Sequence, residues 1–598
     1  MDPATFFLIA SLLVGILYCI TIPYGAGFDE ERHLARIYQM SKYHFLPNVA
    51  KAQMHEVVAD LSYQRRLIQT PAFDMFSKEN FWIRFSEFGK IRYGIRLQSI
   101  YSPIIFLPQA LIGRLLWWKY DFPILPTILL QRIAGLLIYI AGGYAAIRVI
   151  PYGKWGLAAL ALFPSALFQA STLNADGFTS AASFAFIGWV IFVYMNESAG
   201  IMPRSIWILA ALSIWLGLSK PGAIVLLPLL LILIKHPFPS KKWVIALGAG
   251  ALLAVIANFG WWMLASQGSV FSGGGEQSIS RQSSMILSDP SSFLKSLLHG
   301  IVLTFPDQVR GWTAAYGYWA GKVPTPVYFF SVSFLLAAFF AEPRSKRIPS
   351  ITRIFLAGIF LFCCTAIYSI VFEANYATGG DLAMAKHGRY YIPFVPLLFL
   401  GFVGLFDVSE NLQRLMKSIA IISFLLVTVF YSFGIYTTYY TYCGYDATIG
   451  GTCTLPIYKN LEKEGGPSAG INNAEHAIQT FTNQCGELEM VQVYVRAIPE
   501  SSDGSLRFSL SDENHQTLAT RDFSIRDIIA ENYLSLPVLL PPNYKNKNFE
   551  INLESINLRP LEQFEFAGVP GDYYPGQLTV NRLLRQGDLI IHYTCANP

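Results

Sequence analysis

A succession of long apolar runs constrains this chain more than any other feature of its sequence. A helix needs about 20 mainly apolar residues to cross a bilayer, and runs of this length recur throughout residues 1–439. Only 14% of the chain is charged, whereas soluble globular proteins carry about 25%. The composition excludes a soluble enzyme, a disordered chain and a nucleic-acid-binding module. It predicts an α-helical multi-pass membrane protein.

The apolar runs predict eleven spans. One long stretch, 205–235, is broken at Ser219–Gly222 and predicts two short spans. The other spans are residues 5–22, 126–147, 155–171, 178–195, 243–264, 324–341, 353–372, 388–406 and 418–437. We expect the ambiguous run 101–118 to be re-entrant or interfacial; counting it differently would give twelve or thirteen spans.

Basic residues set the expected orientation. Lys and Arg gather in cytoplasmic loops, and such clusters occur at 235–242, 344–353 and 414–417. They predict an N-terminus inside and a C-terminal part outside. Two long loops, 23–100 and 265–323, then lie on the outer side.

Residues 440–598 differ in kind from the preceding part. They hold 11 Lys and Arg against 19 Asp and Glu, a net charge of −8, while residues 1–439 hold 33 against 20, a net charge of +13. Apolar residues alternate at 491–496, 506–510 and 549–553, which predicts short strands. We therefore predict an extracytoplasmic all-β domain, a sandwich of jelly-roll type.

Four cysteines lie in or beside this acidic part, as expected for disulfides in an oxidising compartment. We favour the pairs Cys443–Cys453 and Cys485–Cys595.

The first candidate site follows the first span. If a helix begins at Asp29, then Asp29, His33 and Arg36 share one face, with Glu30 beside them. A carboxylate among cations at a membrane surface suits a general base near an anionic substrate. The alternative is structural: Asp29 caps a helix and the rest is a solvated face.

Further candidates lie at other predicted outer ends of spans. Asp176 follows a polar turn, Lys220 stands alone in an apolar stretch, and His387, Arg389 and Tyr390 open the span 388–406. An ionisable residue at membrane depth is costly and usually functional. The alternatives are a helix cap for Asp176, a snorkelling side chain for Lys220 and an interfacial belt for the last group. The predicted topology places all of them at one membrane face, which favours chemistry on a phosphate-bearing lipid.

Short motifs carry a resemblance. They are Asp29-Glu30 with His33, Asn174-x-Asp176, Leu218-x-Lys220 and Gly388-Arg389-Tyr390-Tyr391 before Pro393. They resemble a bacterial family of multi-pass membrane proteins similar to the GT-C glycosyltransferase superfamily. The resemblance covers roughly residues 5–437 and implies a bacterial cytoplasmic-membrane enzyme that uses a polyprenyl-phosphate-linked sugar.

The resemblance also implies roles. Asp29 would be the base, with Glu30 in reserve, while His33 and Asp176 would orient the reactants. Lys220 and Arg389 would hold the donor phosphate, with Arg36, His387 and Tyr390 near them. The acceptor would be an envelope polysaccharide or lipid-linked glycan, and the β-domain resembles carbohydrate-binding modules. GT-C enzymes differ in metal use; these acids and His33 offer ligands for a divalent ion, but we expect no obligatory metal.

Two other functions remain open. A lipid-linked glycan flippase predicts ionisable residues at the bilayer midplane and repeated halves, and neither is evident in the sequence. A non-catalytic glycan-binding envelope scaffold predicts that the outer-face acids are dispensable.

Overall fold

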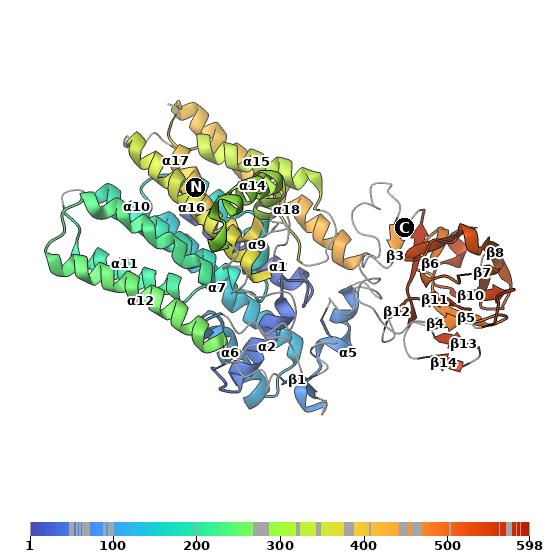
Figure 1. The fold of residues 1–598 in the computed structure, drawn as a ribbon. Helices are drawn as coiled ribbons and strands as arrows, with labels where there is room; N and C mark the ends of the chain where they lie inside the picture. The colour runs from blue at the N-terminus through green and yellow to red at the C-terminus, as the bar shows by residue number, and fades with distance from the viewer. Residues whose placement is uncertain are drawn as a thin grey trace. The chain divides into compact units, whose positions relative to one another are not determined.

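The computed structural model describes most of the chain. The described residues are 2–46, 53–55, 58, 61–62, 72–87, 91–93, 101–197, 200–266, 286–317, 323–342, 348–375, 388–405, 408–441, 453–455, 469–500, 504–560, 562–569, 577–581, 583–585 and 588–596. They form two compact units, one mainly of residues 1–433 and one mainly of residues 434–598. We call them the helical unit and the β-module (Figure 1).

Six helices of the helical unit and its boundary are long and apolar enough to cross a membrane. They are α1 (Pro3–Thr21), α7 (Ile124–Val149), α10 (Asp176–Asn196), α12 (Lys241–Ser266), α16 (Ser350–Asn375) and α18 (Glu410–Tyr440). All six were predicted as spans. Three shorter apolar helices are α11 (Pro203–Gly217), η6 (Pro221–Lys235) and α15 (Thr325–Phe340). The long stretch 205–235 is thus broken at the predicted place. The total of eleven spans and their orientation stay predictions.

Two predicted spans are interrupted. Residues 155–171 form α8 (Lys154–Ala161) and α9 (Pro164–Ala170) instead of one helix. Pro164 lacks a backbone N–H and fits the first turn of a helix, so it starts α9 rather than continuing α8. The run 388–406 is likewise divided into η8 (Gly388–Tyr391) and α17 (Val395–Phe402).

The segments between the long helices are also helical. The ambiguous run becomes η4 (Pro103–Phe106), α6 (Leu107–Gly113) and η5 (Arg114–Lys119). The two long loops, 23–100 and 265–323, contain α2 (Glu30–Ser41), η2 (Ala72–Phe76), α5 (Lys78–Phe81), η3 (Phe85–Glu87), a small sheet of β1 (Gln53–His55) with β2 (Ile91–Tyr93), and α14 (Pro290–Thr313). Each piece is too short or too polar to count among the candidate spans.

Helix packing gives the helical unit its layers. Helix α10 packs along α7, and α11 packs along α12 (Figure 1). Gly217 permits the second contact, because a Cβ there would lie 2.3 Å from the Ala254 carbonyl oxygen. After α15, the buried Glu342 carboxylate accepts a hydrogen bond from the backbone N–H of Trp155 in the first turn of α8. This contact joins the end of α15 to the start of α8.

The β-module contains two antiparallel six-stranded sheets. The first has the order β14-β13-β5-β10-β7-β8, and the second runs β3-β16-β6-β11-β4 with β9 paired to β6. The strands of the first sheet are β5 (His476–Thr482), β7 (Ser505–Asp512), β8 (Thr517–Ser524), β10 (Asn548–Ile556), β13 (Leu578–Val580) and β14 (Leu583–Arg585). Those of the second are β3 (Cys453–Leu455), β4 (Ala469–Ile471), β6 (Leu488–Ala497), β9 (Asn532–Leu540), β11 (Phe564–Phe566) and β16 (Ile591–Cys595). A separate pair, β12 (Gly568–Val569) with β15 (Asp588–Leu589), completes the module.

One apolar core lies between the two sheets. It contains Phe508 and Phe549 from the first sheet and Val493 and Phe566 from the second, and all four are fully buried. The alternation read from the sequence produces this core, because every second residue of β6, β7 and β10 points inward. The predicted strands are therefore confirmed; the jelly-roll topology stays a prediction.

The predicted Cys485–Cys595 disulfide is present, with a Cα–Cα distance of 5.2 Å. Cys453 is also disulfide-bonded. Its expected partner, Cys443, lies outside the described residues, and so does the candidate site residue His387.

Candidate functional site

Asp176 is the centre of a cluster of charged and aromatic side chains in the helical unit. Its carboxylate forms an ion pair with Lys220 Nζ and lies 3.9 Å from Arg389 Nε. The three side chains are only 14%, 10% and 7% exposed for Lys220, Asp176 and Arg389 respectively. Residues far apart in sequence thus meet, as predicted from the sequence.

Local structure explains why Asp176 is available for these cations. The predicted alternative gave Asp176 the role of a helix cap, but the side chain of Asn174 takes it. Asn174 Oδ1 accepts hydrogen bonds from the backbone N–H groups of Asp176 (2.8 Å) and Gly177 (3.3 Å) at the start of α10. The Asp176 carboxylate is then free to face Lys220 and Arg389.

Aromatic rings surround the two cations. Lys220 Nζ lies 4.5 Å from the ring centre of Tyr390 and 5.2 Å from that of Tyr101. The Arg389 guanidinium lies 3.9 Å from the ring centre of Phe28 and donates to the Tyr390 hydroxyl at 3.0 Å. Cation–π contacts hold a positive charge without neutralising it. The cations are thereby fixed in place while they keep their charge for a ligand.

A close backbone contact positions Arg389. It belongs to η8, which packs against α14. Gly388 makes this possible, because a Cβ at that position would lie 2.2 Å from the carbonyl oxygen of Gln308 in α14. A larger residue at 388 would push Arg389 away from Asp176.

His33 lies at the edge of the cluster. Its ring stacks on Tyr101 at 5.7 Å and contacts Phe106 at 5.4 Å. Burial holds the pKa of His33 well below its ordinary value, and the positive charges of Lys220, Arg389 and Arg32 lower it further. The imidazole is therefore neutral near pH 7. Among the described residues, its buried Nδ1 atom has no hydrogen-bond partner.

Asp29 directly precedes α2 and has a backbone conformation that is rare for a residue with a side chain. Its φ is 54° and ψ is 22°, in the left-handed region. Its carboxylate makes no capping hydrogen bond; instead it lies 3.2 Å from Arg32 and is 22% exposed. Unfavourable backbone conformations of this kind are common at functional sites. Asp29 is thus a partly exposed carboxylate that interacts electrostatically with Tyr101, and its carbonyl accepts a hydrogen bond from the His33 N–H.

Glu30 has a different role from its neighbour. Its two carboxylate oxygens accept five hydrogen bonds, two of them from the Arg132 guanidinium at 2.8 Å. The other donors are the backbone N–H groups of Gly25 (2.9 Å), Gly27 (3.2 Å) and Leu173 (2.9 Å). Glu30 is fully buried. A carboxylate with all its acceptor positions in use cannot readily take a proton from a substrate, so Glu30 is a structural residue rather than the reserve base.

Arg132 was missed by the sequence analysis, although it stands within the apolar run 126–147. Besides Glu30, it donates to the carbonyl oxygens of Cys19, Ile22 and Pro23 at the end of α1. The pair ties α1, the start of α2 and α7 together. We call Glu30 with Arg132 the buried clamp. An Arg inside an apolar span needs a partner, which was the signal available in the sequence.

Arg36 does not join the cluster around Asp176. Its guanidinium donates to the side chain of Gln39 (2.6 Å) and to the carbonyl oxygens of His44 (3.1 Å) and Phe45. Burial lowers its pKa to about 10. Arg36 therefore holds the end of α2 against the chain that follows it. Tyr101, by contrast, contacts His33 and Lys220 and is a site residue that the sequence analysis did not select.

Metal ligands are not assembled here. Among the described residues, no group of three or more His, Cys, Asp or Glu side chains is placed to hold an ion. Asp176 and Glu30 face cations, and Asp29 pairs with Arg32.

A protein-family model described as a predicted membrane protein (DUF2142) matches residues 12–398. The chain belongs to this family. The DUF2142 region contains Asp29, His33, Asp176, Lys220 and Arg389, so the whole cluster lies within it. The strands of the β-module lie beyond it.

Other comparisons add little to the DUF2142 assignment. A search of curated proteins finds no match. Among solved structures, the arabinosyltransferase EmbB from Mycobacterium smegmatis matches with 10% identity and a TM-score of 0.25, over 100% of this chain and 64% of that chain. The VP2 subviral particle of infectious bursal disease virus matches with 14% identity and a TM-score of 0.09, over 25% of this chain and 35% of that one. These TM-scores are too low for either likeness to carry an argument.

Proposed function

We propose that this protein is an integral membrane glycosyltransferase of GT-C type. It moves a sugar from a polyprenyl-phosphate carrier to a glycan or polysaccharide acceptor outside the cytoplasmic membrane. One observation carries the proposal: two buried cations, Lys220 and Arg389, converge on Asp176, and the neutral imidazole of His33 contacts the same Tyr101 ring as Lys220. Asp29, a partly exposed carboxylate, interacts electrostatically with this Tyr101.

The proposed reaction is a single displacement with inversion. The acceptor hydroxyl oxygen attacks the anomeric carbon of the donor, and its proton passes to the Asp29 carboxylate. The bond between the anomeric carbon and the phosphate oxygen breaks, and the electron pair leaves with the polyprenyl phosphate. Lys220 and Arg389 stabilise the charge that develops on this phosphate, because fixed cations in a poorly hydrated site interact strongly with it.

The remaining residues support this arrangement. Asp176 keeps the two cations in place before the donor binds, and Tyr390 and Tyr101 flank Lys220. His33, neutral and buried, supports the site through its ring contacts with Tyr101 and Phe106. The buried clamp fixes the loop that carries Asp29. No step in this scheme requires a metal ion.

The test of the base is the variant Asp29→Asn, which preserves shape and removes the proton acceptor. A general base typically contributes about 10²–10⁴ in rate, so we expect kcat to fall by at least about a hundredfold with donor affinity retained. Turnover is measured in detergent or nanodiscs with a panel of polyprenyl-phosphate sugars, and envelope glycans are compared by mass spectrometry. Glu31→Gln, in the first turn of the same helix, is the matched control. Near-normal turnover of Asp29→Asn would contradict the mechanism and favour a scaffold.

The test of the phosphate site is Arg389→Ala together with the pair Lys220→Met and Asp176→Asn. The paired variant removes both charges of the ion pair, so neither is left buried alone. Both proteins should fold but bind the donor more weakly, since each lacks a cation for the phosphate. Unchanged donor affinity in a folded variant would place the donor elsewhere.

A further inference from the structure

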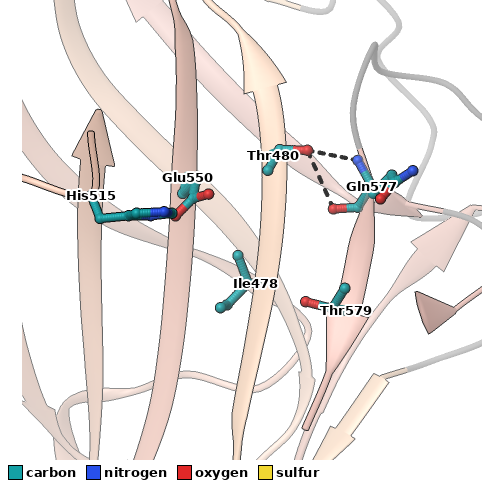
Figure 2. A pocket seen from close by; sticks show the side chains of 6 residues that line it. All are labelled: Ile478, Thr480, His515, Glu550, Gln577 and Thr579. Atoms are coloured by element: carbon teal, nitrogen blue, oxygen red, sulfur yellow. Dashed lines mark hydrogen bonds and ion pairs between the residues drawn. The ribbon is translucent and has the colours of Figure 1, made fainter. Parts of the chain in front are cut away.

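The outer face of the first sheet of the β-module contains a cavity of about 640 Å³. Ligand sites in proteins typically measure about 300–1,000 Å³. Six residues line it: Ile478, Thr480, His515, Glu550, Gln577 and Thr579 (Figure 2). They come from three neighbouring strands, β5, β10 and β13, from the residue before β13, and from the turn between β7 and β8.

Strand register explains why these side chains share one face. Glu550 is directly opposite Thr480, and Thr579 is directly opposite Ile478. Residues opposite one another in adjacent strands point to the same side, and Thr480 lies two positions from Ile478. The inward-pointing neighbours Phe481 and Phe549 belong to the core. The strand register therefore places the polar side chains of the cavity on one face of the sheet.

Hydrogen bonds fix the two ends of the cavity. At one end the backbone N–H of Gln577 donates to Thr480 Oγ1 at 2.6 Å, and that hydroxyl lies 3.4 Å from the Gln577 carbonyl oxygen (Figure 2). At the other end His515 Nδ1 lies 2.9 Å from Glu550 Oε2. The Gln577 backbone is thus held beside the cavity, and the His515 imidazole lies against the Glu550 carboxylate (Figure 2).

The turn that carries His515 is held in an unusual conformation. His515 has a φ of 59°, a region that costs energy for a residue with a side chain. Asp512 stabilises the turn: its carboxylate accepts from the backbone N–H groups of Asn514 and Gln516, both at 2.9 Å, and its carbonyl accepts from His515 N. A turn held in this way keeps the backbone of His515 in place beside Glu550.

The lining indicates the chemistry of the ligand. The Thr579 hydroxyl and the Gln577 amide both donate and accept hydrogen bonds, and Glu550 accepts. The Thr480 hydroxyl is already bonded to the Gln577 backbone. Ile478 adds an apolar surface. A saccharide offers hydroxyl groups that match the first set and C–H faces that match the second. None of the six lining residues is Lys or Arg, and the acidic charge of residues 440–598 disfavours a phosphate or a uronic acid.

We infer that this cavity is a binding site for a neutral saccharide chain. It is separate from the proposed transferase site and does not depend on it: the site could hold a glycan whether or not the helical unit transfers a sugar.

Binding of the full-length protein, in detergent, to an array of oligosaccharides tests the inference. The array carries neutral glucans, mannans, arabinans and galactans beside polygalacturonate and heparin fragments. We expect binding to at least one neutral class and to neither anionic class. Thr579→Arg, which fills the cavity, and Glu550→Gln, which weakens a charge-assisted hydrogen bond, should each lower affinity by about tenfold or more.

The matched control is Thr520→Arg. Thr520 is opposite Ser509 on the same outer face, but outside the cavity, so this variant should bind within about twofold of the parent. Melting temperatures of all variants report folding. No binding to neutral glycans, preference for the anionic probes, or equal affinity of Thr579→Arg and Thr520→Arg would overturn the inference.

The same experiment separates this inference from the proposed function. Asp29→Asn should bind the array like the parent. Sugar transfer without array binding would defeat only the saccharide site, and array binding without transfer would defeat only the glycosyltransferase proposal.

Discussion

The helical unit and the β-module use ion pairs in opposite surroundings. In the Arg132–Glu30 pair of the helical unit the side chains are 3% and 0% exposed. In the Arg507–Asp522 pair of the β-module they are 44% and 53% exposed. Breaking a buried pair leaves a charge without water or partner, whereas an exposed charge is simply solvated. An ion pair should therefore contribute strongly to stability in the helical unit and weakly in the β-module.

The largest effect is expected from Arg132→Leu. Removing the guanidinium leaves Glu30 buried and ionised without its cation, a change that typically costs about 3–5 kcal/mol. We expect a marked fall in melting temperature in detergent. The double variant with Glu30→Gln should recover part of the loss. Arg148→Leu is the control, because Arg148 lies exposed near the end of the same helix, α7. Equal stability of Arg132→Leu and Arg148→Leu would show that the buried ion pair contributes no more to stability than an exposed Arg.

An intermediate effect is expected at Glu342, a buried carboxylate with no described cation bonded to it. Burial raises its pKa from 4.5 to about 7, despite the Trp155 N–H. The folded state then binds its proton more tightly than the unfolded chain, so stability falls as pH rises from about 4.5 to 7. A shift of this size corresponds to roughly 3 kcal/mol. Glu342→Gln keeps the acceptor and removes the charge.

Melting temperatures between pH 4 and pH 9 test this prediction. The Glu342→Gln variant should match the parent at pH 4 and exceed it above pH 7. If both proteins show the same pH profile, Glu342 is not the group responsible.

The smallest effect is expected from Arg507→Ala. Arg507 lies between Asp522 and Glu554 on the outer face of the sheet, where all three are well exposed. Hydrogen bonding to Arg507 lowers the pKa of Asp522, so any stabilisation exists above the ordinary pKa of 3.8 and disappears as pH falls through the native value. At pH 7 we expect no measurable change in melting temperature, with or without added salt. A large change in melting temperature would show that an exposed ion pair can contribute as much to stability as a buried one.

The sequence predicts the fold well where a local rule decides it. Apolar runs identify the six long helices, and alternation identifies β6, β7 and β10. A single break, Ser219–Gly222, correctly divides one long stretch in two. Prediction failed at 155–171, where the hydropathy of the run concealed the effect of Pro164 on helix continuity.

The candidate site was predicted in part, because membrane depth makes a charged residue conspicuous. His33, Asp176, Lys220, Arg389 and Tyr390 do come together, whereas Asp29 pairs with Arg32 and Arg36 lies elsewhere. The sequence could not show which distant residue each charged side chain contacts. Nothing local distinguishes Glu30, which binds Arg132 from 102 residues away, from Asp29, which does not. Tyr101 was equally hidden, since an aromatic residue in an apolar region is ordinary.

Strand order in the β-module has a consequence for how the module is made. The long strand β6 pairs with β16, and a disulfide joins cysteines 110 residues apart beside these strands. During synthesis, residues 488–493 have no partner on that edge until residues 591–595 arrive. Contacts this distant in sequence form slowly, and an unpaired edge invites the wrong neighbour. The second sheet is thus completed only when its last strand, β16, arrives, and the Cys485–Cys595 disulfide then links this strand covalently to the residues just before β6.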